Sequence, residues 1–300
     1  MKKPFVANLD AIRHTMKHYP SELPVQYWLN TGQEELHRVL GSTELGIPYG
    51  KLIELCGNES NGKTALALEI GRYAQADDAY VIWVDFENSF DSSWARKRGM
   101  RLLRQFTLIQ AYLKKAKGNK EEDIATCEEL CAEMRAVIKA VAKHYKKILV
   151  VVDSIAAMET AKESEAGDEH ANMNTGLDLP RYLSRTMKKW TKLGLVHNVM
   201  FLVINQLRVK PMSFGDPEYT VGGKAIPFYC SIRAKLRLVK GGRMIQGAKT
   251  IGLKGSLTNF KNKVGHGSTP YEKIGFKIFY EKGKPAQFLE LKEVKGEDNE

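Results

Sequence analysis

Cysteines and long apolar runs are both scarce in this 300-residue sequence. Its 4 cysteines are too few, in a chain of this length, to form a disulfide framework. No apolar run reaches the roughly 18 residues that a membrane-spanning helix needs. The two lysines after Met1 are not followed by the apolar stretch of a secretory signal. We therefore expect a protein of the reducing cytoplasm with no membrane-spanning helix.

Acidic residues are also in the minority. There are 35 Asp+Glu and 46 Lys+Arg, which gives a formal net charge of +11 and a pI near 9.3. The excess is concentrated in residues 231–284, which hold 13 basic and 2 acidic side chains, whereas the last 16 residues hold 2 basic and 5 acidic ones. Such a basic block indicates a polyanionic partner, with ordinary solvated surface as the alternative. The hydrophobic fraction of 43% excludes a disordered solvating chain and suffices for one large or two small domains.

Two pairs of possible metal ligands stand one helical turn apart. They are Cys127 with Cys131, and His14 with His18. No second pair lies nearby in the sequence to complete a tetrahedral set of ligands. A metal site of this kind is therefore disfavoured.

Strands and helices alternate along the middle of the chain. Apolar runs bounded by polar residues predict buried strands at Leu52–Leu55, Tyr80–Val84, Ile148–Val152 and Val199–Ile204. Helical patterns cover residues 64–76, 121–145 and 180–193. This alternation predicts an α/β fold with a mainly parallel central sheet flanked by helices, whose ligands bind at the carboxyl ends of the strands.

The segment before this core predicts a terminal arm. Residues 8–19 have a helical pattern that Pro20 ends, and the stretch Leu23–Trp28 reads as extended with large apolar groups. This arm can dock on a neighbouring copy or pack on its own core, and the pattern leaves both open. Residues 114–123 read as a charged surface loop, and residues 296–300 as a disordered acidic end.

Residues 57–64 match the P-loop pattern G-x-x-x-x-G-K-[ST] at every fixed position. The backbone N–H groups of such a loop wrap a phosphate, and the N-terminus of the following helix adds partial positive charge. Lys63 neutralises the outer phosphates, and the Thr64 hydroxyl ligates Mg²⁺. Because the loop lies between a predicted strand and a predicted helix, we expect a nucleotide site at Gly57, Asn58, Glu59, Ser60, Asn61, Gly62, Lys63, Thr64 and Ala65.

Polar groups that follow three of the strands can complete this site. Asp153 is placed to hold magnesium through water, with a cap of the next segment as the alternative. Glu87 can polarise an attacking water, which hydrolysis requires beyond binding. Gln206, an uncharged amide, can sense the terminal phosphate.

The chain resembles the bacterial RecA recombinase family in a series of blocks that occur in the family's order from about Asn30 to Tyr280. Beside the P-loop, these blocks are Asp85 to Asp91, Ala95 to Gly99, Val151 to Ala157, Ile204 to Arg208, Phe214 to Glu218, Gly222 to Ala225, Phe228 with Tyr229, and Lys261 to Lys263. The resemblance implies a RecA-type core and a DNA-dependent ATPase that uses ATP and Mg²⁺. It further implies a helical filament on single-stranded DNA that pairs with homologous duplex DNA and exchanges strands, with single-strand-binding or loading proteins as further partners.

By the same resemblance, Glu87 looks like the catalytic glutamate and Gln206 like the link between the ATP state and a DNA-binding loop. Asp91 and Trp94 fall where the family contacts adenine, and Tyr280 matches a second tyrosine on the adenine side. Lys261 and Lys263 resemble a pair that reaches across the protomer interface to a neighbour's ATP. A complete site would then need two subunits.

The resemblance also implies two mobile DNA-binding loops, at about residues 159–175 and 208–224. Cations would contact phosphates, and apolar side chains would wedge between bases. The expected DNA-binding residues are Arg181, Ser184, Lys188, Arg208, Lys210, Met212, Phe214, Gly222, Gly223 and Lys224. Phe214 has an ordinary alternative as a loop anchor.

Departures from the family pattern shape the expected domains. Asn58 and Asn61 replace the usual residues at variable P-loop positions, and the first DNA loop is longer than typical. The chain stops about 20 residues after Tyr280, so the family's large C-terminal domain is expected to be absent or reduced, as in a compact, phage-like recombinase. We expect an N-terminal helix and polymerisation arm at 1–30, a RecA-type ATPase and DNA-binding core at 31–285, and a short acidic tail at 286–300.

Two other functions remain open from the sequence. A RecA-fold ring ATPase or helicase would form closed rings, and a non-catalytic recombination mediator would bind DNA and a true recombinase. A binding-only mediator has no need for Glu87, which argues against it.

Overall fold

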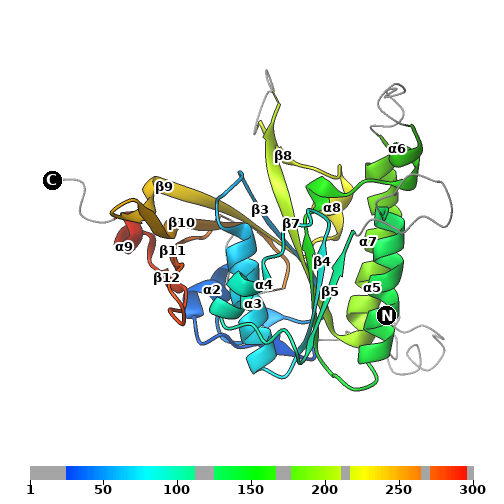
Figure 1. Cartoon of the computed structure of the whole chain (residues 1–300), viewed down its shortest axis with the longest axis horizontal. Helices are drawn as coiled ribbons and strands as arrows, with labels where there is room; N and C mark the ends of the chain where they lie inside the picture. The colour runs from blue at the N-terminus through cyan, green and yellow to red at the C-terminus, as the bar shows by residue number, and fades with distance from the viewer. Residues whose placement is uncertain (1–24, 112–124, 167–176, 211–216, 265–270, 296–300) are drawn as a thin grey trace, which may run out of the picture.

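One ten-stranded sheet runs through the protein in the order β12-β11-β10-β9-β3-β7-β6-β4-β5, with β8 paired to β7 (Figure 1). The computed structural model describes residues 25–111, 125–166, 177–210, 217–264 and 271–295. Helices cover both faces of the sheet. The expected α/β fold with a mainly parallel central sheet is therefore confirmed.

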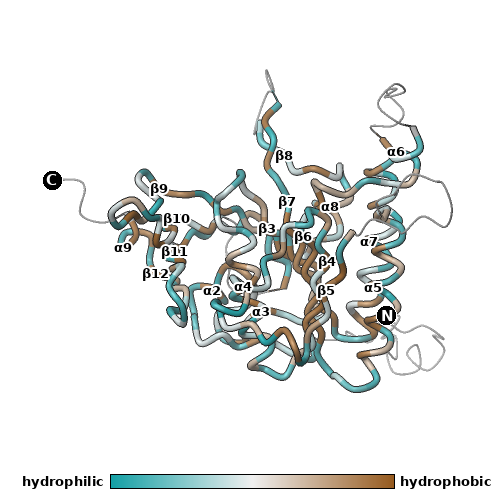
Figure 2. Tube along the Cα trace, viewed as in Figure 1, coloured by the Kyte–Doolittle hydropathy of each residue, from teal (hydrophilic) through white to brown (hydrophobic). Residues whose placement is uncertain are grey.

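The parallel half of the sheet contains the four predicted strands. They are β3 (Leu52–Gly57), β4 (Tyr80–Asp85), β6 (Ile148–Asp153) and β7 (Val199–Val209), with β5 (Phe106–Gln110) added at the edge. Successive residues of β6 enter opposite cores: Ile148 and Val150 pack on one face, and Leu149 and Val151 on the other. Burial on both faces explains why these strands read as continuous apolar runs, which Figure 2 shows as brown segments at the centre.

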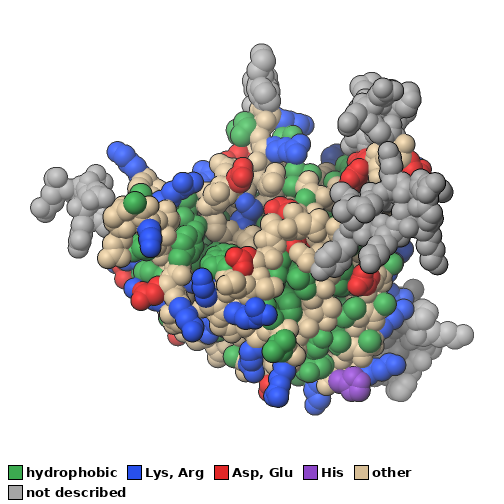
Figure 3. Space-filling view, viewed as in Figure 1, with side chains coloured by type: hydrophobic (Ala, Val, Ile, Leu, Met, Phe, Trp, Pro, Cys, Tyr) green, Lys and Arg blue, Asp and Glu red, His purple; other side chains and the backbone are tan. Residues whose placement is uncertain are grey.

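The basic block of the sequence forms strands that were not predicted. These are β9 (Ile232–Gln246), β10 (Lys249–Asn262) and β11 (Lys273–Phe279), which pair antiparallel with one another, while β9 lies parallel to β3. Only one face of this extension is apolar, with Leu253 and Leu257 buried in the core and cations on the other side. Figure 3 shows Lys and Arg side chains along this part of the molecule.

Strand β7 continues beyond its predicted end. Asn205 and Gln206 were expected to follow the strand, but they lie within it, at the last positions paired with β3. From Leu207 onward, β7 pairs antiparallel with β8 (Glu218–Thr220). The strand is longer because this second partner takes over where β3 ends.

Helices α2 (Glu34–Leu40), α3 (Lys63–Ala76) and α4 (Ser92–Lys97) pack on one face of the sheet, and α5 (Cys127–Val141) and α7 (Asp178–His197) on the other. Shorter helices are η1 (Ile155–Ala157), α6 (Ala161–Ala166), α8 (Ala225–Tyr229) and α9 (Leu291–Lys295). The helix predicted at 121–145 is shorter than expected in the described part of that range. It begins at Cys127 because Thr126 and Glu129 form a capping box there.

The described end of the predicted arm packs on its own core. Strand β1 (Trp28–Leu29) pairs with β2 (Ile47–Pro48), and Leu29 is fully buried. Residues 1–24, which include His14, His18 and the predicted helix, lie outside the described residues. The same holds for the charged loop at 114–123 and for residues 296–300.

The expected acidic tail contains part of the sheet. Strand β12 (Gln287–Leu289) pairs with β11, and α9 follows it. Phe288 and Val294 are buried, and a Cβ at Gly275 would lie 2.1 Å from Val294 Cγ2. Because Val294 packs directly against the β11 backbone, ordered structure extends past the boundary expected at residue 285.

Candidate functional site

The P-loop connects β3 to α3 at the carboxyl edge of the parallel strands, and its two fixed glycines serve different needs. Gly62 has φ +89, in the left-handed region that favours glycine. Gly57 has no such φ, but a Cβ there would lie 2.7 Å from the Leu236 carbonyl oxygen of β9. Asn61 also contacts this strand, since its Nδ2 donates to Leu236 O at 3.2 Å. The loop is therefore held closely against the neighbouring strand.

Lys63 is folded back over the loop. Its Nζ donates to the carbonyl oxygens of Gly57 at 3.1 Å and Asn58 at 2.7 Å. Burial lowers the pKa of Lys63, whereas the nearby carboxylates of Asp153 and Glu87 act to raise it. These carbonyl contacts occupy the ammonium group that a bound phosphate would otherwise attract.

Asp153 and Thr64 meet across the site. Thr64 Oγ1 donates to Asp153 Oδ2 at 3.0 Å, and Asp153 is only 2% exposed at the end of β6. Burial, and then the charge of Glu87, raises the pKa of Asp153 to about 7. A hydroxyl and a carboxylate are ligands that suit Mg²⁺, and a cation would relieve the repulsion between Asp153 and Glu87. The side chains present therefore fit a magnesium ion.

Glu87 lies beside this pair. Its Oε1 accepts a hydrogen bond of 2.5 Å from Ser154 Oγ. Strands β4 and β6 are paired in register, with Asp85 opposite Asp153, which brings the segments after both strands together. The expected gathering of strand-end groups at one edge of the sheet is thus observed.

A cavity of about 260 Å³ joins these groups. Eleven of the predicted site residues line it: Glu59, Ser60, Gly62, Lys63, Thr64, Ala65, Glu87, Trp94, Asp153, Gln206 and Tyr280. The sequence missed two further lining residues, Ile204 and Leu253. Ile204 falls inside a predicted strand, but no local signal marks Leu253, which reaches the cavity through the pairing of β9 with β10.

Two aromatic side chains form one wall of the cavity. Trp94 on α4 and Tyr280 after β11 contact each other edge to face, with ring centroids 6.2 Å apart. Asp91 was expected to contact the adenine base, but it is not among the described residues that line the cavity. Instead its Oδ1 accepts hydrogen bonds from the backbone N–H groups of Ser93 and Trp94, so it caps the helix that carries Trp94.

Lys261 and Lys263 are not among the described residues that line this cavity. Lys261 Nζ donates to Pro227 O at 2.5 Å and also to Cys230 O, at the end of α8. Burial, and then the charge of Lys263, lowers the pKa of Lys261. The two lysines therefore lie away from the phosphate loop of their own chain.

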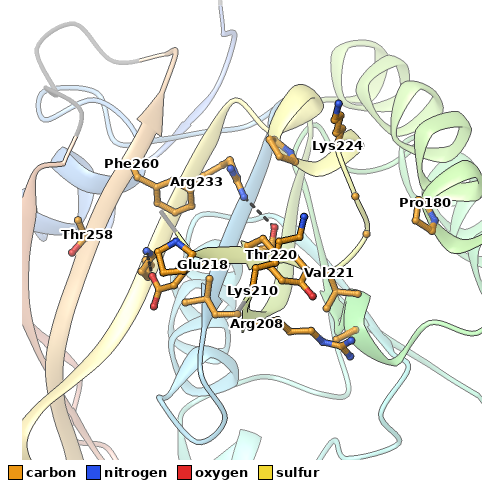
Figure 4. Close-up of a pocket in the computed structure, with 18 of the residues that line it drawn as sticks. Pro180, Arg208, Lys210, Glu218, Thr220, Val221, Lys224, Arg233, Thr258 and Phe260 are labelled. Atoms are coloured by element: carbon orange, nitrogen blue, oxygen red, sulfur yellow. Dashed lines mark hydrogen bonds and ion pairs between the residues drawn. The ribbon is translucent and has the colours of Figure 1, made fainter. Parts of the chain in front are cut away.

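A second, larger groove of about 1060 Å³ lies beside β8 (Figure 4). Of the expected DNA-binding residues, it brings together Arg208, Lys210, Gly222, Gly223 and Lys224. Figure 4 shows Arg208 and Lys210 low in the centre of the close-up, with Lys224 above them and Pro180 at the right. Met212 and Phe214 lie outside the described residues.

Three predicted DNA-binding residues of α7, two cations and one hydroxyl, are not among the groove's described lining residues. They are Arg181, Ser184 and Lys188. Ser184 Oγ donates to Pro180 O at 2.9 Å, and Arg181 is 3.8 Å from Asp178 while its side chain remains 61% exposed. The structure thus does not join them to the residues of the second loop.

Cations of β9 also line this groove, although the sequence did not place them there. Arg233, Lys235 and Arg237 face it, and the last two contact Glu218 at 2.5 Å. The hydrogen bond from Lys235 is the main cause that lowers the pKa of Glu218. Part of the positive charge in the groove is therefore neutralised within the chain.

Glu54 connects this groove to the interior of the sheet. It is fully buried on β3, and it contacts Arg233 at 2.5 Å through Oε2 and Asn205 Nδ2 at 2.9 Å through Oε1. Arg233 Nη2 in turn donates to Thr220 Oγ1 at 3.1 Å, the contact dashed in Figure 4. Asn205 directly precedes Gln206, which lines the nucleotide cavity. The Glu54 carboxylate therefore connects β7, beside that cavity, to Arg233 in the groove.

Cys127 and Cys131, one of the two pairs considered as metal ligands, are buried. Cys127 and Cys131 are free thiols, and burial raises the pKa of Cys131 to about 11. Among the described residues, no group of three or more His, Cys, Asp or Glu side chains is arranged to hold a metal ion. None of the helices in the described ranges is long and apolar enough to cross a membrane.

A parallel sheet whose carboxyl edge carries a P-loop, a Thr–Asp pair and a strand-end glutamate defines a P-loop nucleotide-binding protein. Within that class, the family model described as the RecA N-terminal domain matches residues 20–284, and the chain belongs to this family. It is 33% identical over 258 residues to the "Protein RecA" of Rhodopirellula baltica, covering 85% of this chain and 61% of that protein. It is 31% identical over 280 residues to the "Protein RecA" of Geobacter sulfurreducens, covering 91% of this chain and 74% of that protein.

Proposed function

We propose that this protein is an ATP- and Mg²⁺-dependent DNA recombinase that forms a helical filament on single-stranded DNA and exchanges strands with homologous duplex DNA. The observation that carries the proposal is the cavity that gathers the P-loop, Glu87, Asp153, Gln206 and two aromatic rings. The names of the two relatives support the same function.

The side chains divide the work of hydrolysis. The P-loop backbone and Lys63 hold the phosphates, after Lys63 leaves the carbonyl oxygens of Gly57 and Asn58. Thr64 and Asp153 hold Mg²⁺, which when bound neutralises phosphate charge. Glu87 orients and polarises the attacking water. Trp94 and Tyr280 contact the base.

Gln206 and the groove account for the dependence of ATP hydrolysis on DNA. Gln206 lines the nucleotide cavity, and the same strand continues to Arg208, which lines the groove. We infer that this strand carries the ATP state to the DNA-binding residues. Cations of the groove, such as Lys210 and Lys224, contact phosphates of the single strand.

Assembly completes the site. Lys261 and Lys263 lie away from their own P-loop, which supports a role at the ATP of a neighbouring subunit. The polymerisation arm at 1–30 would join neighbouring subunits. Four buried free thiols support work in the reducing cytoplasm.

The test combines an ATPase assay with electron microscopy. We expect ATP hydrolysis to be stimulated by single-stranded DNA, and open helical filaments to form with ATP. Lys63→Ala should lose nucleotide-supported DNA binding and strand exchange, because the phosphates lose their cation. Closed rings would favour a ring ATPase, and DNA binding without hydrolysis would favour a mediator.

A further inference from the structure

A buried ion pair lies behind the aromatic wall of the cavity. Arg98 Nη2 and Glu69 Oε2 are 2.8 Å apart, and each side chain is 1% exposed. Glu69 is on α3, and Arg98 follows α4 as its C-cap. Removing one member of such a pair leaves an uncompensated charge in the interior. Arg98 lies within the block Ala95 to Gly99 that carries the family resemblance, but that resemblance assigns no role to Arg98 or to Glu69.

Arg98 contacts the main chain of both segments that carry the aromatic rings. Its backbone N–H donates to Trp94 O at 3.0 Å. Its Nη1 donates to the carbonyl oxygen of Phe279, the last residue of β11, which directly precedes Tyr280. One side chain therefore ties α4 to the end of β11.

Glu69 joins this wall to the phosphate-binding helix. Helix α3 begins at Lys63, so Glu69 is part of the same rigid element as the end of the P-loop. Its Oε1 also accepts hydrogen bonds from Arg72 Nη2 at 2.6 Å and from the backbone N–H of Ala286 at 3.3 Å. The carboxylate thus holds elements from three distant parts of the chain together.

We propose that the Glu69–Arg98 ion pair positions the nucleobase wall of the cavity relative to the P-loop, and so sets affinity for the base rather than for the phosphates. Trp94 and Tyr280 belong to different elements, and a base contacts both correctly only if those elements keep a fixed separation. The phosphates are bound by the P-loop and the first residues of α3, Lys63 and Thr64, whose described hydrogen bonds do not include Arg98. This inference rests on the proposed nucleotide binding.

The experiment compares ATP with inorganic tripolyphosphate, which has no base. We expect Arg98→Met to weaken ATP binding about tenfold, or about 1.4 kcal/mol, and to change tripolyphosphate binding by less than about twofold. Isothermal titration calorimetry gives both dissociation constants. The fluorescence change of Trp94 on ATP binding should fall in the same variant.

Arg72→Ala is the matched control. It removes a cation from the same carboxylate, but Arg72 is partly exposed, and among the residues that the structure describes it makes no hydrogen bond or ion pair with α4 or β11. We expect its ratio of ATP to tripolyphosphate affinity to equal that of the wild type. Arg98→Lys, which keeps the charge, should recover part of the lost ATP affinity.

The double variant Glu69→Gln, Arg98→Met guards against misfolding, because it removes both charges of the buried pair and leaves only the partly exposed Arg72 without its partner. It should show the same selective loss of ATP affinity. Equal weakening of both ligands, or no weakening, would overturn the inference, and failure of both variants to fold would assign the pair to folding alone and also overturn it. If the wild type bound neither ligand, the proposed function itself would fail.

Discussion

Ser154 Oγ donates a hydrogen bond of 2.5 Å to Glu87 Oε1, which joins the segments that follow β6 and β4. The bond fixes one oxygen of the carboxylate that lines the cavity beside Asp153. In the proposed mechanism Glu87 is a general base that must be oriented toward its water, so this serine would bear on the efficiency of Glu87.

We expect Glu87→Gln to keep ATP and DNA bound but to slow hydrolysis by about a hundredfold or more, since the amide cannot accept the proton. Steady-state ATP turnover with single-stranded DNA, measured beside nucleotide affinity, tests this. Ser154→Ala keeps the Glu87 carboxylate, so its rate of ATP hydrolysis should fall by about tenfold or less. Normal turnover in the Glu87 variant would remove this residue from catalysis.

The double variant Lys261→Ala, Lys263→Ala should lose ATP hydrolysis as filament assembly fails. Mixing in subunits with intact lysines should partly restore turnover, because in the proposed filament each lysine pair serves a neighbour's site. The control is Lys254→Ala, Lys277→Ala, which removes the same charge from directly paired positions of β10 and β11. Absence of recovery in mixed filaments would mean that the lysines act within one chain, where Lys261 contacts the end of α8.

Glu54→Ala should destabilise the fold by about 3–5 kcal/mol, because it leaves Arg233 without its buried partner. Urea unfolding followed by circular dichroism measures the change. Glu218→Gln, which disrupts partly exposed ion pairs with Lys235 and Arg237, should cost only about 1 kcal/mol or less. Equal effects of the two variants would contradict the interior role of Glu54.

His37 should make stability depend on pH. The backbone N–H of Thr31 donates to His37 Nε2 at 2.9 Å, which requires a neutral ring, and burial lowers the pKa of His37 below its usual 6.5. The unfolded chain therefore binds a proton before the folded one does, so stability is fully present above pH 6.5 and falls as the pH drops below it.

His37→Gln keeps an acceptor but does not titrate. The free energy of unfolding of the wild type should fall relative to this variant by up to about 1.4 kcal/mol per pH unit below the unfolded pKa. Thermal unfolding from pH 8 to about pH 5 makes the comparison. Parallel curves for the two proteins would mean that the pKa of His37 is the same in the folded and the unfolded chain.

The sequence predicted the elements whose signals are local. The P-loop has fixed residues at fixed spacing, and strands such as Ile148–Asp153 are apolar throughout because both faces are buried. Strands β9 to β11 were missed because only one face is apolar, and the lysines of the other face read as a charged surface. Their residues read as a basic block rather than as half of a sheet.

The site was predictable to a similar extent. The phosphate side follows from the P-loop and the strand ends, whereas Trp94 and Tyr280 came only from the family resemblance. Leu253 enters the cavity through strand register, and Glu69 meets Arg98 through packing between helices. Neither pairing has a signature in the spacing of residues along the chain.

The meeting of Trp94 with Tyr280 has a consequence for synthesis of the protein. The P-loop is made early, but Leu253 and Tyr280, which close the other side of the cavity, belong to the last strands of the sheet. A nascent chain that has emerged only through β7 has a phosphate loop without its base wall. Nucleotide can contact such a chain only through its phosphates, so the part of its mass-action stabilisation that comes from the base reaches only the finished chain.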